Sequence, residues 1–375
     1  MNHPRLRTEH QPTRRPDGRI QIGSLPGLAS ILPDPDGWRW DLLQLLDGTL
    51  TTAEIVQTVT TEHPSVPAAR IERLLSDLGR AGHLQFAVHG RPPARVASAT
   101  AKRHPRTVEY WEMVDTSPDR TGWDIQRLLA GAVVTVVGVG GVGAAAAATL
   151  AGAGIGRLVL VDPDHVEEAN LSRQLLYTQS DIDRPKVDAA RERLLERNPQ
   201  LDVVTRPERI ASQPQFVSLM QDCNLLIVAA DEPDGLRLTA NRAALDTSCP
   251  WVDAGYHGPV ISTALYLPGT GRPCWECLRH ADATAYGLPG LNGDALPAAL
   301  PRPLGNPVTA ASAGIAGNYA AQAALTHLTG TRGGFPPATI QRHSLIAPAD
   351  QQPAAITHPR NPDCLSCARH PVQTP

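Results

Sequence analysis

A glycine-rich turn follows an apolar, β-branched segment in the middle of the chain, Val133–Val137. Four glycines lie in this turn: Gly138, Gly140, Gly141 and Gly143. Glycines let backbone N–H groups approach a phosphate at the start of a helix, where the helix dipole favours anions. A second apolar segment ends at Asp162, nineteen residues after Gly143, a suitable distance for an acid that binds ribose hydroxyls. These residues predict a nucleotide-binding α/β domain, and alone they leave a nicotinamide oxidoreductase open.

The segment after Asp162 carries charges that distinguish a triphosphate site from a nicotinamide site. Its polar residues include Asp164, Asn170, Arg173, Gln174 and Lys186. A nicotinamide needs an apolar slot, whereas a triphosphate needs Arg and Lys to neutralise the charge that builds up as pyrophosphate leaves. A further apolar segment, Leu225–Ala230, is followed by Asp231, which is suited to holding Mg²⁺ on the phosphates. The pattern favours nucleotidyl transfer.

Two C-x-x-C pairs predict a metal site. They consist of Cys274, Cys277, Cys364 and Cys367, and Cys364 comes 87 positions after Cys277. Each pair can chelate from one turn, and two pairs make a tetrahedral sulfur site for Zn²⁺. Because four thiolates leave no position open for water, we expect a structural zinc that attaches the C-terminal tail; two redox dithiols are the alternative. The remaining cysteines, Cys223 and Cys249, are expected to be buried apolar residues.

The elements that position these residues fall into four predicted segments. They are a disordered N-terminus at 1–17, a small winged-helix-like α+β domain at 18–89, a linker at 90–105, and an α/β domain with a mainly parallel sheet at 106–375. The small domain should contain a hairpin, three helices and a returning strand. Between Asp36 and Gly90 four arginines face seven acidic residues, which argues against DNA binding.

Composition excludes several classes of protein. The chain has 375 residues, a formal net charge of −3 and a pI near 6.5, so no overall positive charge attracts nucleic acid. The polar N-terminus lacks an apolar secretion signal, which predicts a cytoplasmic protein. The uncharged stretch Ala132–Gly156 is long enough to span a membrane, but its glycine pattern predicts a buried strand and helix.

These motifs, in this order, resemble the ThiF/MoeB/ubiquitin-activating family of adenylating enzymes. The resemblance covers about Val133 to Cys277 and implies an ATP site. It places Asp162 on the ribose, Asn170, Arg173, Gln174 and Lys186 on the phosphates, and Mg²⁺ on Asp231. Upstream, Arg103 and Arg106 match the family's R-x-x-R motif, whose second arginine acts on the partner subunit's nucleotide in a homodimer.

The small N-terminal domain resembles the leader-peptide recognition domains of ribosomal peptide pathways, which bind peptides by strand addition. With the adenylation motifs and two C-x-x-C pairs, it is similar to microcin C-type peptide adenylating enzymes. This resemblance implies ATP-dependent adenylation of a precursor-peptide carboxylate, with other pathway enzymes as possible partners. His280–Asn306 contains no cysteine, which disfavours thioester transfer. A sulfur-carrier adenylyltransferase and a non-catalytic scaffold that presents a leader peptide remain alternatives.

Overall fold

The computed structural model describes residues 3–86, 98–285 and 306–370. It divides into two compact units. Unit 1 comprises residues 1–127 with 330–332, and unit 2 comprises residues 128–329 with 333–375. The predicted boundary at residue 106 therefore lies inside unit 1.

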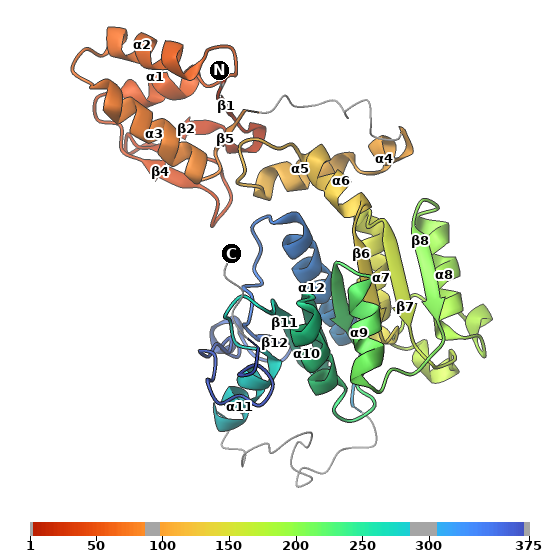
Figure 1. Ribbon diagram of the computed structural model, residues 1–375. Helices are drawn as coiled ribbons and strands as arrows, with labels where there is room; N and C mark the ends of the chain where they lie inside the picture. Colours follow the sequence, from red (N-terminus) through yellow and green to blue (C-terminus); the bar gives the residue numbers. More distant parts are fainter. Residues whose placement is uncertain (1–2, 87–97, 286–305, 371–375) are drawn as a thin grey trace. The chain divides into compact units, whose positions relative to one another are not determined.

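Unit 1 contains the predicted hairpin and three helices (Figure 1). Strands β2 (Pro12–Arg14), β3 (Ile20–Ile22) and β4 (Ser30–Leu32) form an antiparallel sheet in that order. Helices α1 (Trp38–Gln44), α2 (Thr52–Glu62) and α3 (Ala68–Arg80) contribute one apolar face each to its core. Helix α2 begins at a capping box, in which the Thr51 N–H donates to Glu54 at 2.7 Å and the Glu54 N–H donates to the Thr51 hydroxyl at 3.3 Å.

The first residues of the chain differ from the predicted disorder. Strand β1 (Arg5–Leu6) pairs with β5 (Leu84–Gln85), and a short 3₁₀ helix at Thr8–His10 leads into β2. Arg7 is fully buried and donates to the carbonyls of Gly82, Glu112 and Ser117 at 3.0, 2.9 and 2.7 Å. These three carbonyls lie at least 75 positions from Arg7 in the sequence. The polarity of the first residues alone could therefore not show that this segment is ordered.

The predicted linker is also partly ordered. Residues 87–97 lie outside the described part, but Ser98–Arg103 form helix α4. Helices α5 (Pro105–Val114) and α6 (Gly122–Ala130) follow. Pro105 occupies the first turn of α5, where its missing N–H removes no helical hydrogen bond.

Unit 2 confirms the predicted α/β class. Its seven strands lie in the order β12-β11-β10-β9-β6-β7-β8. Five run parallel: β6 (Val133–Val137), β7 (Arg157–Val161), β8 (Asp202–Arg206), β9 (Leu225–Val228) and β10 (Trp251–His257). Strands β11 (Val260–Tyr266) and β12 (Gln341–Ser344) are antiparallel additions at one side. The central strands are buried on both faces, which explains their continuous apolar sequences.

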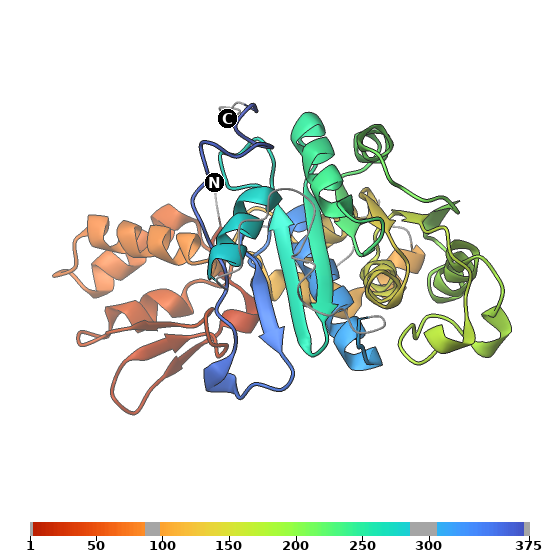
Figure 2. The same cartoon turned by 90° about the horizontal axis from the view of Figure 1, so that it is seen from below.

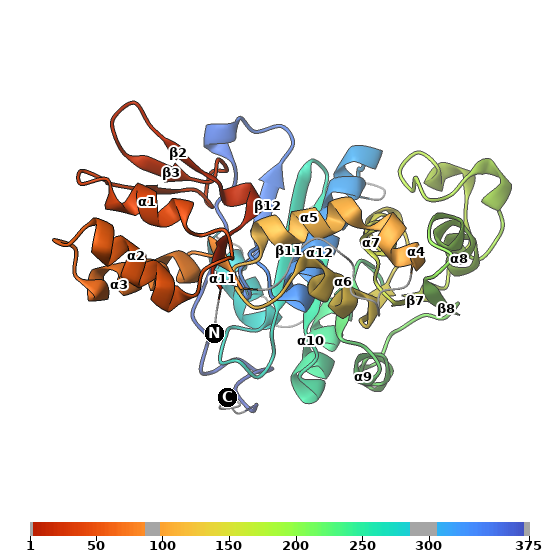
Figure 3. The ribbon, with the colours of Figure 1, turned by 90° about the horizontal axis from the view of Figure 1, so that it is seen from above.

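Helices cover the sheet of unit 2 on both faces (Figures 2 and 3). They are α7 (Gly141–Ala153), α8 (Lys186–Arg197), α9 (Gln213–Gln221), α10 (Leu236–Thr247), α11 (Trp275–Ala285) and α12 (Ala310–Thr329). Helices α7 and α12 can pack closely because Gly317 has no side chain. A Cβ at this position would lie 2.3 Å from the Val142 carbonyl oxygen. Among the described residues, no helix is long and apolar enough to cross a membrane.

Candidate functional site

Three parallel strands of unit 2, β6, β7 and β9, end at one level. Val137 of β6 is in register with Val161 of β7 and with Val228 of β9, and Val228 is in register with Asp253 of β10. The residues that follow these positions therefore meet at one side of the sheet, which we call the carboxyl edge. Ligands of open α/β sheets bind at such edges.

The glycine turn lies at this edge and has little spare room. Gly138 has φ +87°, and a Cβ there would lie 2.7 Å from the Ala230 nitrogen. A Cβ on Gly143 would lie 1.8 Å from the Gly138 carbonyl oxygen, and one on Gly141 would lie 3.1 Å from the Arg173 carbonyl oxygen. Gly140 precedes the first turn of α7. The backbone thus reaches the start of α7 without side chains that would exclude a phosphate.

Asp162 supports this turn from the end of β7. Its carboxylate accepts the Val139 N–H at 2.7 Å and the Asp164 N–H at 2.9 Å, and the residue is buried. Burial raises the pKa of Asp162, against the opposing effects of Lys186 and the two N–H donors. The Tyr177 hydroxyl donates to the Val139 carbonyl at 2.7 Å. Each carboxylate oxygen keeps acceptor capacity that ribose hydroxyls can use.

Lys186 is held at the first position of α8. Its Nζ lies 2.9 Å from the Asp164 carboxylate, and its backbone N–H donates to the Asp164 carbonyl at the same distance. The Lys186 side chain is 8% exposed, whereas that of Asp164 is 53% exposed. The ammonium is therefore fixed in position while its counter-ion remains open to solvent.

Asn170 is the last residue of a 3₁₀ turn at Glu168–Asn170, and Arg173 and Gln174 follow this turn. The Asn170 side chain accepts the Glu167 N–H at 3.2 Å, and Arg173 donates to the Ala169 carbonyl at 2.9 Å. Gln174 is buried, and its side-chain oxygen has no hydrogen-bond partner within the described part of the chain. An unsatisfied buried oxygen beside the glycine turn fits a site completed by a ligand donor.

Asp231 follows β9 and forms part of a charged network that sequence reasoning missed. Arg237 of α10 donates to Asp253 at 2.6 Å and to Asp231 at 3.1 Å. Trp275 donates its indole N–H to the other oxygen of Asp253 at 2.9 Å. Burial disfavours the Arg237 charge, but the two carboxylates outweigh it and raise its pKa. Asp253, the last residue of β10 that pairs with β9, was the available sequence signal.

Tyr256 interacts electrostatically with Arg173 and Asp231. Burial raises the pKa of Tyr256, and Asp231 raises it further, whereas Arg173 lowers it. The Asp231 side chain is 68% exposed, so its carboxylate remains accessible to a cation. This donor suits Mg²⁺, which prefers carboxylate oxygens and bound water.

The remaining catalytic prediction, Arg106, belongs to unit 1. It lies on α5, is 91% exposed, and its guanidinium pairs with Glu109 at 2.8 Å. Its predicted action on a partner subunit stays a prediction.

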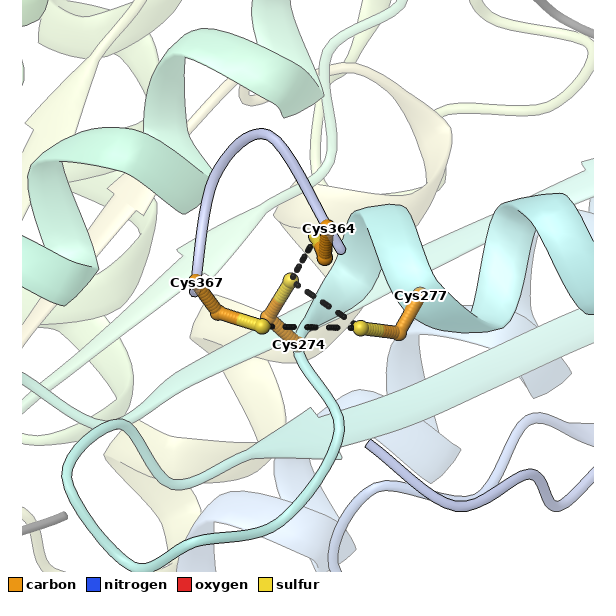
Figure 4. A group of neighbouring side chains, drawn as sticks. All are labelled: Cys274, Cys277, Cys364 and Cys367. Carbon is orange, nitrogen blue, oxygen red and sulfur yellow. Dashed lines mark hydrogen bonds between the residues drawn. The ribbon is translucent and has the colours of Figure 1, made fainter. Parts of the chain in front are cut away.

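The four cysteines of the two C-x-x-C pairs come together in unit 2 (Figure 4). The Sγ–Sγ distances are 3.9 Å for Cys274–Cys277, 3.7 Å for Cys274–Cys364 and 3.5 Å for Cys277–Cys367. Tetrahedral Zn–S bonds of about 2.3 Å would place neighbouring sulfurs about 3.8 Å apart. All four residues are buried, so the cluster fits a closed zinc site that links α11 to the tail.

The other two cysteines lie away from this cluster. Cys249 is buried and Cys223 is half-buried, with 3.8 Å between their sulfurs. They precede β10 and β9, at the opposite ends of these strands from the carboxyl edge.

Comparisons with known proteins agree with this geometry. Residues 116–366 match the ThiF family, and residues 9–67 match the PaaA-like, N-terminal domain. The sulfur carrier protein adenylyltransferase of Thermus thermophilus is 30% identical over 259 residues, which span 68% of this chain and 89% of that protein. The ThiS adenylyltransferase of Escherichia coli is 33% identical over 162 residues, 43% of this chain; the aligned part spans 63% of that relative, less than two thirds.

Solved structures share the fold of the whole chain. Escherichia coli MccB with succinimide superposes with a TM-score of 0.72 at 18% identity, covering 98% of this chain and 100% of that one. PaaA superposes with a TM-score of 0.64 at 23% identity, covering 94% and 98%.

Proposed function

The chain belongs to the ThiF family, and from this premise we propose that it is an adenylyltransferase whose substrate is a carboxylate of a ribosomally synthesised peptide. The observation that carries the proposal is the carboxyl edge. It combines a glycine turn at a helix start, a fixed ammonium at Lys186 and an accessible carboxylate at Asp231. ATP is the proposed nucleotide.

The chemistry follows from where these groups lie. A peptide carboxylate oxygen attacks the α-phosphorus of ATP, the bond from that phosphorus to the β-phosphate oxygen breaks, and pyrophosphate leaves with the bonding electrons. Lys186 and Arg173 neutralise the charge that gathers on the leaving group. Asn170 and Gln174 donate to phosphate oxygens through their side-chain NH2 groups, and Asp162 accepts from the ribose hydroxyls. Mg²⁺, when held at Asp231, supplies further positive charge to the phosphates.

Two further parts of the molecule have supporting roles. Zinc bound by the four cysteines fixes the tail and takes no part in the reaction, because a closed sulfur site has no open position. In a homodimer, Arg106 of one subunit acts on the nucleotide of the other. Pyrophosphate release by an Arg106→Ala variant, measured alone and mixed with Lys186→Ala subunits, tests this arrangement. Recovery in the mixture supports action in trans.

A peptide substrate is supported by unit 1. This unit matches the PaaA-like, N-terminal domain, and MccB, which shares the fold, has been crystallised with the MccA peptide and with ATP. The sheet of unit 1 also ends at β4, whose outer edge pairs with no other described strand. A free strand edge of this kind can accept an extended peptide.

A sulfur-carrier adenylyltransferase is the second candidate, because two relatives of 30% and 33% identity carry that name. Exchange of labelled pyrophosphate into ATP separates the two. We expect exchange with a precursor peptide chosen from short reading frames near this chain's gene, and none with ThiS of Escherichia coli. The reverse result would favour the second candidate.

A further inference from the structure

Three arginines of unit 1 have no acidic partner within the described residues and also lie over tryptophan rings. Several arginines of this unit form ion pairs: Arg7, Arg15, Arg19, Arg80, Arg106 and Arg120. Arg14, Arg39 and Arg70 form none within the described part of the chain. Each instead lies over a tryptophan ring of α1.

Arg39 and Arg70 share one indole. The Cζ atoms of Arg39 and Arg70 lie 4.7 and 5.4 Å from the centre of the Trp38 ring, which is buried. Arg39 is half-buried and comes from α1, whereas Arg70 is exposed and comes from the first turn of α3. One terminal nitrogen of Arg39, Nη1, is buried without a hydrogen-bond partner among the described residues. Two like charges near one ring, with an unsatisfied donor, leave the pair short of negative charge.

The acidic groups nearest to Arg39 do not supply the missing negative charge. The carboxylate of Asp34 caps α1 by accepting the N–H groups of Arg39 and Trp40 at 3.1 and 3.3 Å. Burial lowers the pKa of Arg39, and Arg70 lowers it further, while Asp34 and Asp36 only partly offset these effects.

The cluster formed by Arg39, Arg70 and Trp38 lies where a peptide added to the edge of β4 would end or begin. Strand β4 ends at Leu32, and Asp34, two residues later, caps the helix that carries Trp38 and Arg39. Ile31 of β4 is 46% exposed, which provides apolar surface beside the free strand edge. At the same end of the sheet, Arg14 is in line with Leu32 across β3 and lies 4.7 Å over the Trp40 ring.

We propose that Arg39 and Arg70, held on Trp38, bind the carboxylate of an aspartate or glutamate side chain in the peptide substrate. The proposal rests on the proposed function, since it assigns a sequence feature to that peptide. A planar guanidinium matches a carboxylate through two parallel hydrogen bonds, and the tryptophan restrains the guanidinium before the peptide arrives. Arg14 on Trp40 adds positive charge at the same end of the sheet.

The test uses the full-length chain and a random-sequence peptide library displayed on phage. We expect the selected peptides to share an acidic residue at one position. The best binder is then synthesised with glutamate and with glutamine at that position. The wild-type chain should bind the glutamate form about tenfold more tightly, the effect of one charge-assisted hydrogen bond.

Arg70→Gln should remove this preference, so that both peptides bind with equal affinity. Arg73→Gln is the matched control, because Arg73 is also exposed on α3 but lies over no described tryptophan, and it should keep the preference. Arg39→Gln should act like Arg70→Gln while its melting temperature shows that unit 1 remains folded. A purely structural arginine would alter stability without altering the choice between glutamate and glutamine.

Other outcomes overturn the site. Peptides selected without an acidic residue, or a preference that survives Arg70→Gln, would refute it and leave peptide adenylation intact. If the library yields no binder, the site and the peptide substrate both fail. If a short single-stranded DNA oligonucleotide binds and Arg70→Gln abolishes this binding, the cluster recognises phosphate rather than peptide.

Discussion

The two units of this chain hold their polar groups in different ways. At the carboxyl edge of unit 2, cations already have counter-ions: Lys186 has Asp164, and Arg237 has Asp231 and Asp253. In unit 1, the arginines on α1 and α3 that lie over Trp38 have no acidic partner among the residues that the structure describes.

The difference indicates whether the protein or the ligand supplies the opposite charge in each unit. A cation that must stabilise a developing charge is most effective when its position is set in advance, and neighbouring carboxylates achieve this at the carboxyl edge. A surface that recognises a charged peptide can instead leave its arginines unpaired, so that the missing charge comes with the ligand. If this is right, perturbations of the two units should have separable effects.

Removal of the metal should have the largest effect, and it should fall on unit 2. Cys364→Ser breaks the closed sulfur site, and we expect unit 2 to lose about 5 kcal/mol of stability, because metal binding contributes directly to folding free energy. Zinc content from elemental analysis and calorimetric unfolding check this. Cys223→Ser, a cysteine outside the cluster, should keep both zinc and stability. Loss of zinc without a change in the unfolding of unit 2 would contradict a structural metal.

Lys186→Ala should abolish chemistry while leaving the fold of both units unchanged. We expect pyrophosphate release to fall by about 10³-fold, or about 4 kcal/mol of transition-state stabilisation. The chain contains one other lysine, Lys102, which is exposed on α4 and provides the matched control. Lys102→Ala should retain wild-type turnover. Full activity in the Lys186 variant would show that the assigned phosphate site is wrong.

Acid should lower the stability of unit 1 through His83. His83 is buried against His10 at 3.0 Å and Ser30 at 2.7 Å, and burial, followed by the charges of His10, Arg332 and Arg7, lowers its pKa to about 4. The unfolded chain takes up this proton near pH 6.5 and the folded chain does not, so stability falls between about pH 6.5 and pH 4, by about 3 kcal/mol in total.

Chemical denaturation across this pH range tests the prediction. In His83→Gln the slope of stability against pH should decrease in unit 1, whatever the starting stability of the variant. His257→Gln, in which an exposed histidine of unit 2 is replaced, should leave the slope unchanged. An unaltered slope in His83→Gln would show that another group titrates.

Much of unit 2 could be predicted because its signals are local. Continuous apolar segments indicated the buried parallel strands. The glycines between β6 and α7 indicated a turn in which backbone segments lie in close contact. The spacing of the cysteines was sufficient to predict that distant parts of the chain meet. The roles assigned to Arg173, Lys186 and Asp231 stay predictions, although the structure places them at one edge.

The errors arose where long-range contacts decide the structure. Arg7 lies in a polar segment that resembles a disordered terminus, and only the carbonyls of Gly82, Glu112 and Ser117 explain its burial. Arg237 was missed because Asp231 follows β9 while Asp253 lies within β10, and only the register of the sheet brings the two carboxylates together.

The most direct test of the account is Mg·ATP-dependent pyrophosphate release with precursor peptides chosen from short reading frames near this gene, followed by mass spectrometry of the peptides. The account predicts stoichiometric pyrophosphate and a peptide that carries an adenylyl group or has lost water after capture of the activated carboxyl group. An unchanged peptide and no pyrophosphate, with zinc content, folding and peptide binding all verified, would contradict it and favour a unit that only presents the peptide to another enzyme.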